Sequence, residues 1–406
     1  MPERRVGLWL IGALGGVGST VALGLAALRR GLTDSTGLVT ALPIFDGLDL
    51  DGPGQFVVGG HDIRRGVLAG SVATLARRIG AFDPAVVEAV MPDLESWGEN
   101  IRTGTVINSG ETIAALADRP DLTRATTPKA VIERVQQDLR EFRDRHRLDQ
   151  VVVINVASTE PAAALRSEHA SLDRLQPALA KADTELLPVS ALYAFAAIDC
   201  GFPYVNFTPS TGAAVPALEH LADRRGVPIA GRDGKTGETL LKTVLAPMFA
   251  LRNLKLLSWV GHNILGNLDG RVLSDPRNKE SKVRSKDQAI GEIVGYPVQT
   301  HTSIEYIESL DDWKTAWDHV HFQGFLGVRM TLQFTWQGCD SALAAPLVID
   351  LARLALLAQR RGQAGVLKHL ACFFKSPMGV AEQDFYRQVA LLAEYVESAR
   401  SPEAHR

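Results

Sequence analysis

A glycine-rich turn near the N-terminus constrains the fold of this chain more than any other feature. The turn reads Gly12-Ala-Leu-Gly-Gly-Val-Gly-Ser19, it follows the apolar run Val6–Ile11, and a helical pattern opens at Ser19 and continues to Arg30. A strand, a glycine turn and a helix in this order bring backbone N–H groups and the positive end of a helix to a place where a pyrophosphate can bind. A tight turn without a ligand is the alternative, and the flanking strand and helix favour a dinucleotide site.

The spacing of this turn departs from the usual Gly-x-Gly-x-x-Gly pattern, because Leu14 occupies a position that is normally glycine. The candidate acid for the cofactor ribose is Asp62, which follows the turn by about forty residues. That role therefore requires strands inserted between the turn and Asp62. We predict that the turn contributes these cofactor-binding residues: Gly12, Ala13, Gly15, Gly16, Val17, Gly18 and Ser19.

The N-terminal half alternates short strands with helices. Leu38–Ile44 and Gln55–Val58 have the composition of strands, and helical periodicity returns over Val67–Ile79. Val151–Val156 is a continuous β-branched run, typical of a strand buried on both faces of a parallel sheet, and it ends at Ala157-Ser158-Thr159-Glu160. The pattern predicts an α/β fold with a Rossmann-like domain.

The sequence pattern of the chain changes after residue 239. We predict a helix over Gly237–Asn253, a strand over Lys255–Val260, and further β-rich segments at Thr300–Glu308 and Gly327–Trp336, which together indicate a separate mixed sheet. After Asp340 the pattern is helical, so we expect the chain to return and pack on the first domain. The predicted division is residues 1–239 plus 343–406 for one domain and residues 240–342 for an inserted α+β domain.

Composition excludes several classes of protein. The chain has 406 residues, of which 22% are charged, and a net charge of -3. Its electrostatic field is therefore too weak to recruit nucleic acid or an anionic membrane surface. Three widely spaced cysteines favour reduced thiols in the cytoplasm over a disulfide framework or a sulfur-based metal site. The apolar stretch Ala342–Ala358 carries Pro346, Asp350 and Arg353, so we interpret it as a buried core helix rather than a membrane span.

Lysines are the candidate catalytic groups. Lys279, Lys282 and Lys286 would share one side of a helix, where their mutual repulsion favours an anionic ligand, and Lys314 and Lys375 stand in apolar or aromatic surroundings. For any single lysine, a surface residue that extends its ammonium to solvent is the plainer interpretation.

Other candidate chemistries have weaker support. His319 and His321 form a His-x-His pair without a third ligand nearby in the sequence, which makes a metal site a weak alternative. Ser158 and Ser341 lack the pattern of a nucleophile elbow, so hydrolase chemistry is disfavoured.

Seven segments, taken together, resemble the myo-inositol-1-phosphate synthase family, and most closely its shorter, archaeal-type branch. The resemblance runs in order through essentially the whole chain. Its segments are Val153–Pro161, Asn206–Ser210, Gly231–Thr239, Asn263–Gly270, Asn278–Val283, Asp340–Asp350 and Phe373–Pro377.

The resemblance implies an NAD-dependent enzyme that converts D-glucose 6-phosphate to 1D-myo-inositol 3-phosphate, with NAD reduced and re-oxidised in each turnover. It implies a cytoplasmic homotetramer acting on a sugar phosphate, with no nucleic-acid or membrane partner, and it leaves room for a monovalent or divalent cation near the phosphate. Carried over position by position, it gives the catalytic residues Lys282, Lys286, Lys314, Lys375, Asp233, Asp269, Asp340 and Asn263. Additional cofactor-binding residues are Ala157, Ser158 and Thr159, with Asp233, Asn263 and Asp269 shared between the two groups.

Four positions depart from the family pattern and motivate a second hypothesis. They are Leu14, Arg232, Gly261 and His262. An added cation at Arg232, beside Asp233, would alter phosphate binding or the sugar accepted if it reached the site. The alternative is therefore a related NAD-dependent cyclase for another sugar phosphate, for example fructose 6-phosphate closing to a five-membered carbocycle. A non-catalytic NAD-binding protein is a third possibility, which the retained lysines and acids disfavour.

Overall fold

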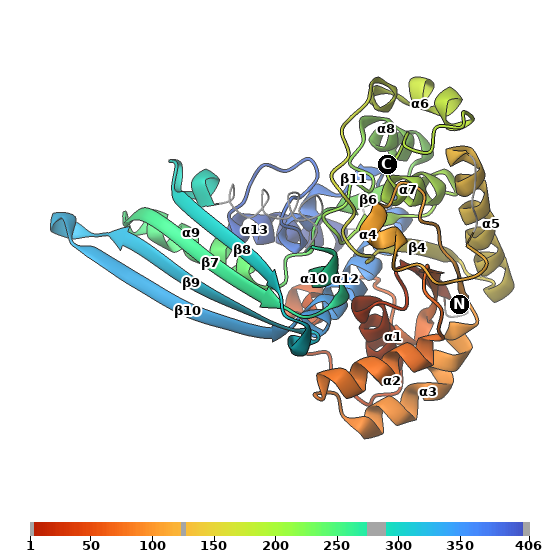
Figure 1. Cartoon of the computed structure of the whole chain (residues 1–406), viewed down its shortest axis with the longest axis horizontal. Helices are drawn as coiled ribbons and strands as arrows, with labels where there is room; N and C mark the ends of the chain where they lie inside the picture. The colour runs from red at the N-terminus through yellow and green to blue at the C-terminus, as the bar shows by residue number, and fades with distance from the viewer. Residues whose placement is uncertain (1–3, 123–126, 274–289, 401–406) are drawn as a thin grey trace.

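A seven-stranded parallel sheet forms the centre of the molecule (Figure 1). The computed structural model describes residues 4–122, 127–273 and 290–400. All neighbouring strands of this sheet pair in parallel, and β1 lies between β2 and β4. The strand order is β11 (Gly365–Val366), β6 (Pro228–Gly231), β5 (Tyr204–Asn206), β4 (Gln150–Asn155), β1 (Val6–Ile11), β2 (Phe56–Asp62) and β3 (Ile101–Thr103). The six strands β3 to β6 follow the Rossmann order 3-2-1-4-5-6, which opens a ligand crevice at the carboxyl ends of β1 and β4.

Helices cover both faces of this sheet, as the predicted α/β class requires. Alternate residues of β1 enter different cores: Leu8 and Leu10 pack on one face, and Trp9 and Ile11 on the other. The first face is covered by α1 (Gly16–Arg29), α2 (Leu68–Ile79), α3 (Pro84–Gly98), α12 (Asp340–Arg360) and α13 (Phe385–Arg400). The second face is covered by α5 (Pro128–His146), α6 (Leu172–Leu179), α7 (Val189–Asp199) and α8 (Pro216–Arg225). Smaller helices are α4 (Glu111–Ala114), η4 (Ser167–Ala170) and η7 (Lys368–Phe373).

Helix α12 is the core helix that the sequence predicted over Ala342–Ala358. Within the described ranges it alone is long and apolar enough to cross a membrane, and most of its apolar window is buried inside the protein. It packs against α1, and its residues Leu351, Leu354 and Ala355 are inaccessible to solvent. The C-terminal segment thus contributes to the same core as the N-terminal strands.

A second sheet of four strands extends away from this body as an arm (Figure 1). Its order is β10 (Arg329–Cys339), β9 (Trp313–Gln323), β7 (Lys255–Leu265) and β8 (Gln299–Tyr306), with β7 parallel to β8 and antiparallel to β9. Helix α9 (Glu238–Leu251) covers one face, where Phe249 packs with Trp259 and Val320. Short helices α10 (Leu268–Val272), η5 (Glu308–Leu310) and η6 (Phe325–Gly327) complete the arm. The predicted domain borders at 239/240 and 342/343 fall inside α9 and α12, and the division itself stays a prediction.

Two predictions of secondary structure are wrong. Residues 38–44 form no strand but the 3-10 helices η1 (Val39–Ala41) and η2 (Pro43–Phe45), because Pro43 lacks an N–H for a ladder. The N–H groups of Val39 and Thr40 instead donate to the Asp350 carboxylate at 2.6 and 3.1 Å. With η3 (Pro53–Gln55), these turns fill the connection between α1 and β2, so no strand is inserted before Asp62. The other correction concerns α1, which begins at Gly16 and not at Ser19, with Gly15 as its N-cap.

Candidate active site

One cavity of about 670 Å³ lies at the carboxyl ends of the parallel strands and is lined by residues of both sheets. Fourteen of the predicted site residues line it, and they come from segments far apart in the sequence. They are Gly12, Gly15, Gly16, Val17, Ser19, Asp62, Ala157, Ser158, Thr159, Asp233, Asp269, Lys314, Asp340 and Lys375. Ala13 and Gly18 belong to the turn without lining the cavity.

The glycine turn is shaped by close contacts that exclude side chains. Gly12 has a φ of 88°, and a Cβ there would lie 2.8 Å from the Cα of Ala157 after β4. A Cβ at Gly18 would lie 2.7 Å from the carbonyl oxygen of Ala13, so this glycine allows helix α1 to pack on the turn. A Cβ at Gly16 would meet Ser341 Oγ at 2.6 Å, which allows α12 to approach the N-terminus of α1.

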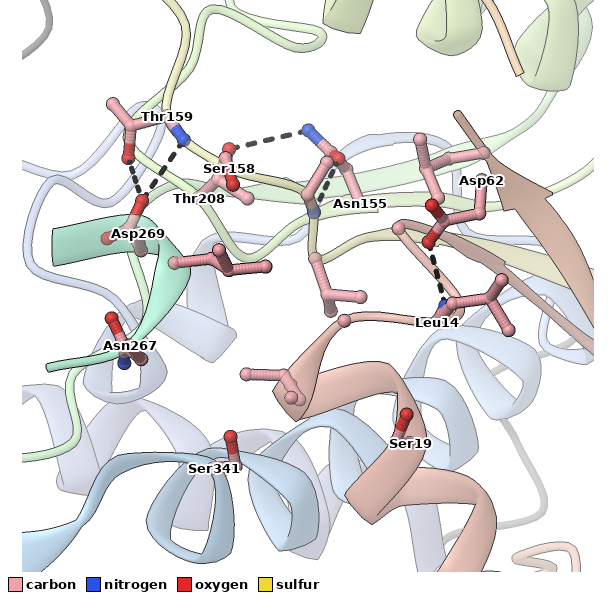
Figure 2. Close-up of a pocket in the computed structure, with 18 of the residues that line it drawn as sticks. Leu14, Ser19, Asp62, Asn155, Ser158, Thr159, Thr208, Asn267, Asp269 and Ser341 are labelled. Atoms are coloured by element: carbon pink, nitrogen blue, oxygen red, sulfur yellow. Dashed lines mark hydrogen bonds between the residues drawn. The ribbon is translucent and has the colours of Figure 1, made fainter. Parts of the chain in front are cut away.

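The residues of this turn fit a pyrophosphate. The N–H groups of Gly16, Val17 and Gly18 lie in the first turn of α1, where a helix offers no acceptor of its own. Ser19 Oγ is buried, lines the cavity and has no hydrogen-bond partner in the described part of the chain. Figure 2 shows Ser19 on helix α1 and Ser341 on the neighbouring helix α12. A dinucleotide phosphate would satisfy these donors.

Asp62 stands at the end of β2, beside the turn. Its Oδ2 accepts the N–H of Leu14 at 2.8 Å (Figure 2), and its Oδ1 accepts the N–H of Arg64 at 2.9 Å. The end of the second strand is where a Rossmann fold places its ribose acid. The role of Asp62 as a ribose ligand stays a prediction, now without the need for inserted strands.

Asp233 and Lys375 also line the cavity, and they form a buried ion pair. Lys375 Nζ donates to Asp233 Oδ1 at 2.8 Å, and the two side chains are 7% and 5% exposed, respectively. A short antiparallel pairing holds them together, in which the N–H of Lys375 donates to the carbonyl of Asp233 at 2.7 Å. Asp233 Oδ2 is buried with no hydrogen-bond partner among the residues that the structure describes. This oxygen can therefore accept a hydrogen bond from a ligand.

Further polar groups surround this pair. Asp269 Oδ1 accepts hydrogen bonds from the N–H and the Oγ1 of Thr159 at 3.2 and 3.1 Å (Figure 2), which joins α10 to the end of β4. Asn267 caps α10 and donates to Asp340 Oδ2 at 3.3 Å. Lys314 lies on β9 and lines the cavity.

The three lysines of the predicted cluster, Lys279, Lys282 and Lys286, lie outside the described residues. The sequence-predicted catalytic roles of Lys282 and Lys286 therefore stay predictions.

Comparison with known proteins assigns the chain to a family. A family model described as myo-inositol-1-phosphate synthase, whose designation is that of an NAD-binding domain, matches residues 6–397. The chain belongs to the myo-inositol-1-phosphate synthase family. The glycine turn and its fit to a pyrophosphate agree with NAD as the cofactor of this family's fold.

Relatives of this family resemble the whole chain. Inositol-3-phosphate synthase 1 of Bacteroides thetaiotaomicron is 33% identical over 398 residues, covering 92% of this chain and 90% of its own. Inositol-3-phosphate synthase of Dictyostelium discoideum is 30% identical over 393 residues, covering 88% and 75%. The crystal structure of inositol-3-phosphate synthase from Caenorhabditis elegans matches with a TM-score of 0.87 and 26% identity, covering 98% of this chain and 86% of that one.

Three of the four departures from the family pattern do not line the cavity. Arg232 is half-buried and its Nη1 donates to the carbonyl oxygen of Pro209 at 3.1 Å. His262 is exposed on the arm, with its Nδ1 2.8 Å from Ser303 Oγ. A Cβ at Gly261 would lie 2.2 Å from Glu238 Oε1, so glycine there makes room for a buried carboxylate. Only Leu14 lines the cavity, and its backbone N–H is the group that binds Asp62.

Asn263 has a different setting from the one expected. It is fully buried in the arm, where its Nδ2 donates to Glu238 Oε2 at 2.7 Å. Asn263 is not among the described residues that line the cavity. Glu238 also pairs with Lys242 at 2.8 Å. His319 and His321 likewise lie outside the cavity lining, and no group of three or more potential metal ligands occurs among the described residues. The cation near the phosphate stays a prediction.

Sequence reasoning missed two acids in the cavity. Burial raises the pKa of Glu160 to about 7, against hydrogen bonds from the Ser190 hydroxyl and N–H that favour its charged form. Burial also raises the pKa of Asp312, which accepts the N–H and Oγ of Ser341 at 2.8 and 2.9 Å beside Gly16. Glu160 was visible as the last residue of the Ala157-Ser158-Thr159-Glu160 segment, whereas nothing in the sequence signals the contact between Asp312 and helix α12.

Proposed function

We propose that this chain is an inositol-3-phosphate synthase, which converts D-glucose 6-phosphate to 1D-myo-inositol 3-phosphate by an intramolecular cyclisation. The observation that carries the proposal is the shared cavity: a turn that fits a pyrophosphate and the buried Asp233–Lys375 pair line the same space. The names of the relatives from Bacteroides thetaiotaomicron and Dictyostelium discoideum support the same activity. No described departure except Leu14 lines the cavity, so no observation favours a different sugar phosphate.

The chemistry explains why this cavity needs fixed cations. NAD, when bound, would accept a hydride from C5 of the sugar and return it there, so the reaction has no net redox change. The C5 ketone acidifies the C6 hydrogens, C6 then attacks the C1 aldehyde, and a six-membered ring closes. Negative charge develops on the C5 oxygen and then on the C1 oxygen. Ammonium groups held in a water-poor site stabilise such charge without reorganising.

We assign the individual roles as follows. Lys375 and Lys282 act at the C5 oxygen as proton shuttles and oxyanion partners, and Asp233 holds Lys375 in position. Lys286 and Lys314 are divided between the phosphate and the C1 carbonyl. Asp269 and Asp340, together with Asp233, keep the surrounding lysines charged, and Asn263 acts through its hydrogen bond to Glu238. The buried contact of Lys375 with Asp233 supports the first assignment.

The proposal includes a homotetramer in the cytoplasm. One face of the arm supports it, because this face carries the exposed Trp317 and has no described element packed on it, while α9 covers the opposite face. The hairpin tip adds Phe325 and Leu326, which are 87% and 84% exposed. Exposed aromatic and aliphatic side chains of this kind are typical of a contact with another chain, and we assign this contact to further copies of this chain.

Incubation with glucose 6-phosphate and a catalytic amount of NAD, followed by NMR of the product, tests the proposal. A cyclitol monophosphate should accumulate without net NADH. Fructose 6-phosphate is tested in a parallel reaction as the alternative substrate. Consumption of fructose 6-phosphate with inert glucose 6-phosphate would replace the synthase assignment with the five-membered cyclase.

A further inference from the structure

Lys235 is a second buried lysine beside the catalytic pair, and neither the cavity lining nor the predicted site includes it. It stands two residues after Asp233, and its backbone N–H donates to the carbonyl of Phe373 at 2.8 Å. The residue as a whole is only 2% exposed to solvent. The same short antiparallel pairing that joins Asp233 to Lys375 therefore fixes the backbone of Lys235.

The ammonium of Lys235 is held by helix α13. Its Nζ donates to Gln388 Oε1 at 2.6 Å and lies 5.7 Å from the centre of the Phe385 ring. Gln388 in turn donates to the backbone carbonyl of Glu382 at 2.5 Å, which fixes its amide orientation. The cation thus has a neutral acceptor and an aromatic face, and no carboxylate among its described hydrogen-bond partners.

Two titratable groups act electrostatically on Lys235. The pKa of Lys235 is lowered to about 8, mainly by burial and to a smaller extent by the positive charge of Lys375, while the Cys372 side chain acts in the opposite direction. Burial raises the pKa of Cys372 to about 12, so its thiol is neutral at physiological pH. Lys235 and Lys375 are two buried amines brought together by the backbone pairing of residues 233–235 with residues 373–375.

We propose that Lys235 is a positioning residue that sets the charge on the Asp233–Lys375 pair, with Gln388 of helix α13 holding its amine in place. The inference rests on the proposed function, in which Lys375 must both accept and donate a proton in each turnover. A protonated Lys235 repels the proton on Lys375 and so lowers the pKa of Lys375, which favours its base form. A neutral Lys235 lets Lys375 keep its proton.

Three variants separate this electrostatic role from a packing role. Lys235→Met keeps the length of the apolar stem and removes the charge, whereas Lys235→Arg keeps the charge. Lys368→Met is the matched control, because it removes an exposed lysine from the neighbouring segment that leads to Lys375. Bound NAD and the thermal midpoint report whether each variant folds.

The expected result is a shift in pH dependence. In Lys235→Met, the acidic limb of the kcat/KM profile for glucose 6-phosphate should move to higher pH by about one unit, lowering kcat/KM on that limb about tenfold. Lys235→Arg and Lys368→Met should keep the wild-type profile. A profile that does not move in folded Lys235→Met, or that moves equally in Lys235→Arg, would overturn the proposal.

A second measurement does not depend on turnover. Competitive acetylation with acetic anhydride over a range of pH, read at Lys375 by mass spectrometry, follows the protonation of that amine directly. Its midpoint should rise in Lys235→Met, and an unchanged midpoint would overturn the inference even if glucose 6-phosphate proves not to be the substrate. If Lys235→Met fails to fold, Gln388→Met should shift the same midpoint upward by removing the acceptor that stabilises the Lys235 ammonium. An unchanged midpoint there would equally overturn the inference.

Discussion

Asp233 and Lys375, which are 142 residues apart in the sequence, meet through a buried contact of 2.8 Å between a carboxylate and an ammonium. The pair joins the end of β6 to the segment after η7, and so it ties the C-terminal part of the chain to the cavity. Its energetic consequence is asymmetric, because removal of one partner leaves a buried charge whereas removal of both does not.

Single and double substitutions of this pair should have different effects on stability and activity. Lys375→Met should lower the free energy of unfolding by about 3–5 kcal/mol, because Asp233 is left charged and buried. The double variant Lys375→Met with Asp233→Asn should recover much of that stability. Both variants should lose activity by about a hundredfold or more, since the oxyanion partner is gone. Chemical denaturation and steady-state kinetics measure the two effects, and wild-type rates in Lys375→Met would remove this lysine from the mechanism.

The glycine turn gives a matched pair of substitutions in one helix. Gly18→Ala puts a methyl group 2.7 Å from the carbonyl oxygen of Ala13, so it should distort the turn and abolish NAD binding. Gly24→Ala lies further along α1, where the new Cβ meets nothing closer than Ile349 Cδ1 at 3.8 Å. It should retain NAD and gain about 0.5–1 kcal/mol in helix stability. Isothermal titration with NAD compares the two, and full binding by Gly18→Ala would contradict the turn assignment.

Glu160 gives a prediction about pH. Burial raises its pKa from 4.5 to about 7, so the folded state holds this proton more tightly than the unfolded chain between those values. Its contribution to stability is therefore fully present below about pH 4.5 and is lost as the pH rises through about 7. Relative to Glu160→Gln, the wild type should lose thermal stability between about pH 5 and about pH 8. A constant difference between their thermal midpoints over this range would contradict the prediction.

The exposed face of the arm gives a prediction about assembly. Trp317 is 46% exposed there, and Trp317→Glu should reduce the mass of the oligomer in light scattering because it replaces an aromatic contact residue by a charge. Tyr386→Glu is the control, since Tyr386 is an exposed aromatic residue of α13 and not of the arm. Bound NAD should be unchanged in both. A wild-type mass for Trp317→Glu would argue against an interface on this face.

The local signals in the sequence predicted the elements that hold the cofactor end of the site. The run Val151–Val156 is β4 within one residue at each end, and the glycine-rich segment starts directly after β1 and leads into α1, whose first residue is Gly16. Hydrophobic runs bounded by glycine identify such strands because the sequence period and the burial coincide.

Contacts between distant residues were not predictable in the same way. The predicted strand at 38–44 fails because its amides are satisfied by Asp350, which is 310 residues further along the chain from Thr40. Likewise, the approach of Ser341 to Gly16 and the filling of the space at Gly261 by Glu238 depend on how helices α12 and α9 pack. The departures at Arg232 and His262 could be judged only once their side chains were located outside the cavity lining.

The most direct test of the central claim follows one hydrogen through the reaction. Glucose 6-phosphate carrying deuterium at C5 should be converted, with a catalytic amount of NAD, to an inositol monophosphate that retains the deuterium on the corresponding ring carbon. NADH should not accumulate, because the hydride removed from C5 returns to C5. Recovery of unchanged glucose 6-phosphate from folded protein with bound NAD, or a cyclised product that has lost the deuterium, would contradict the account.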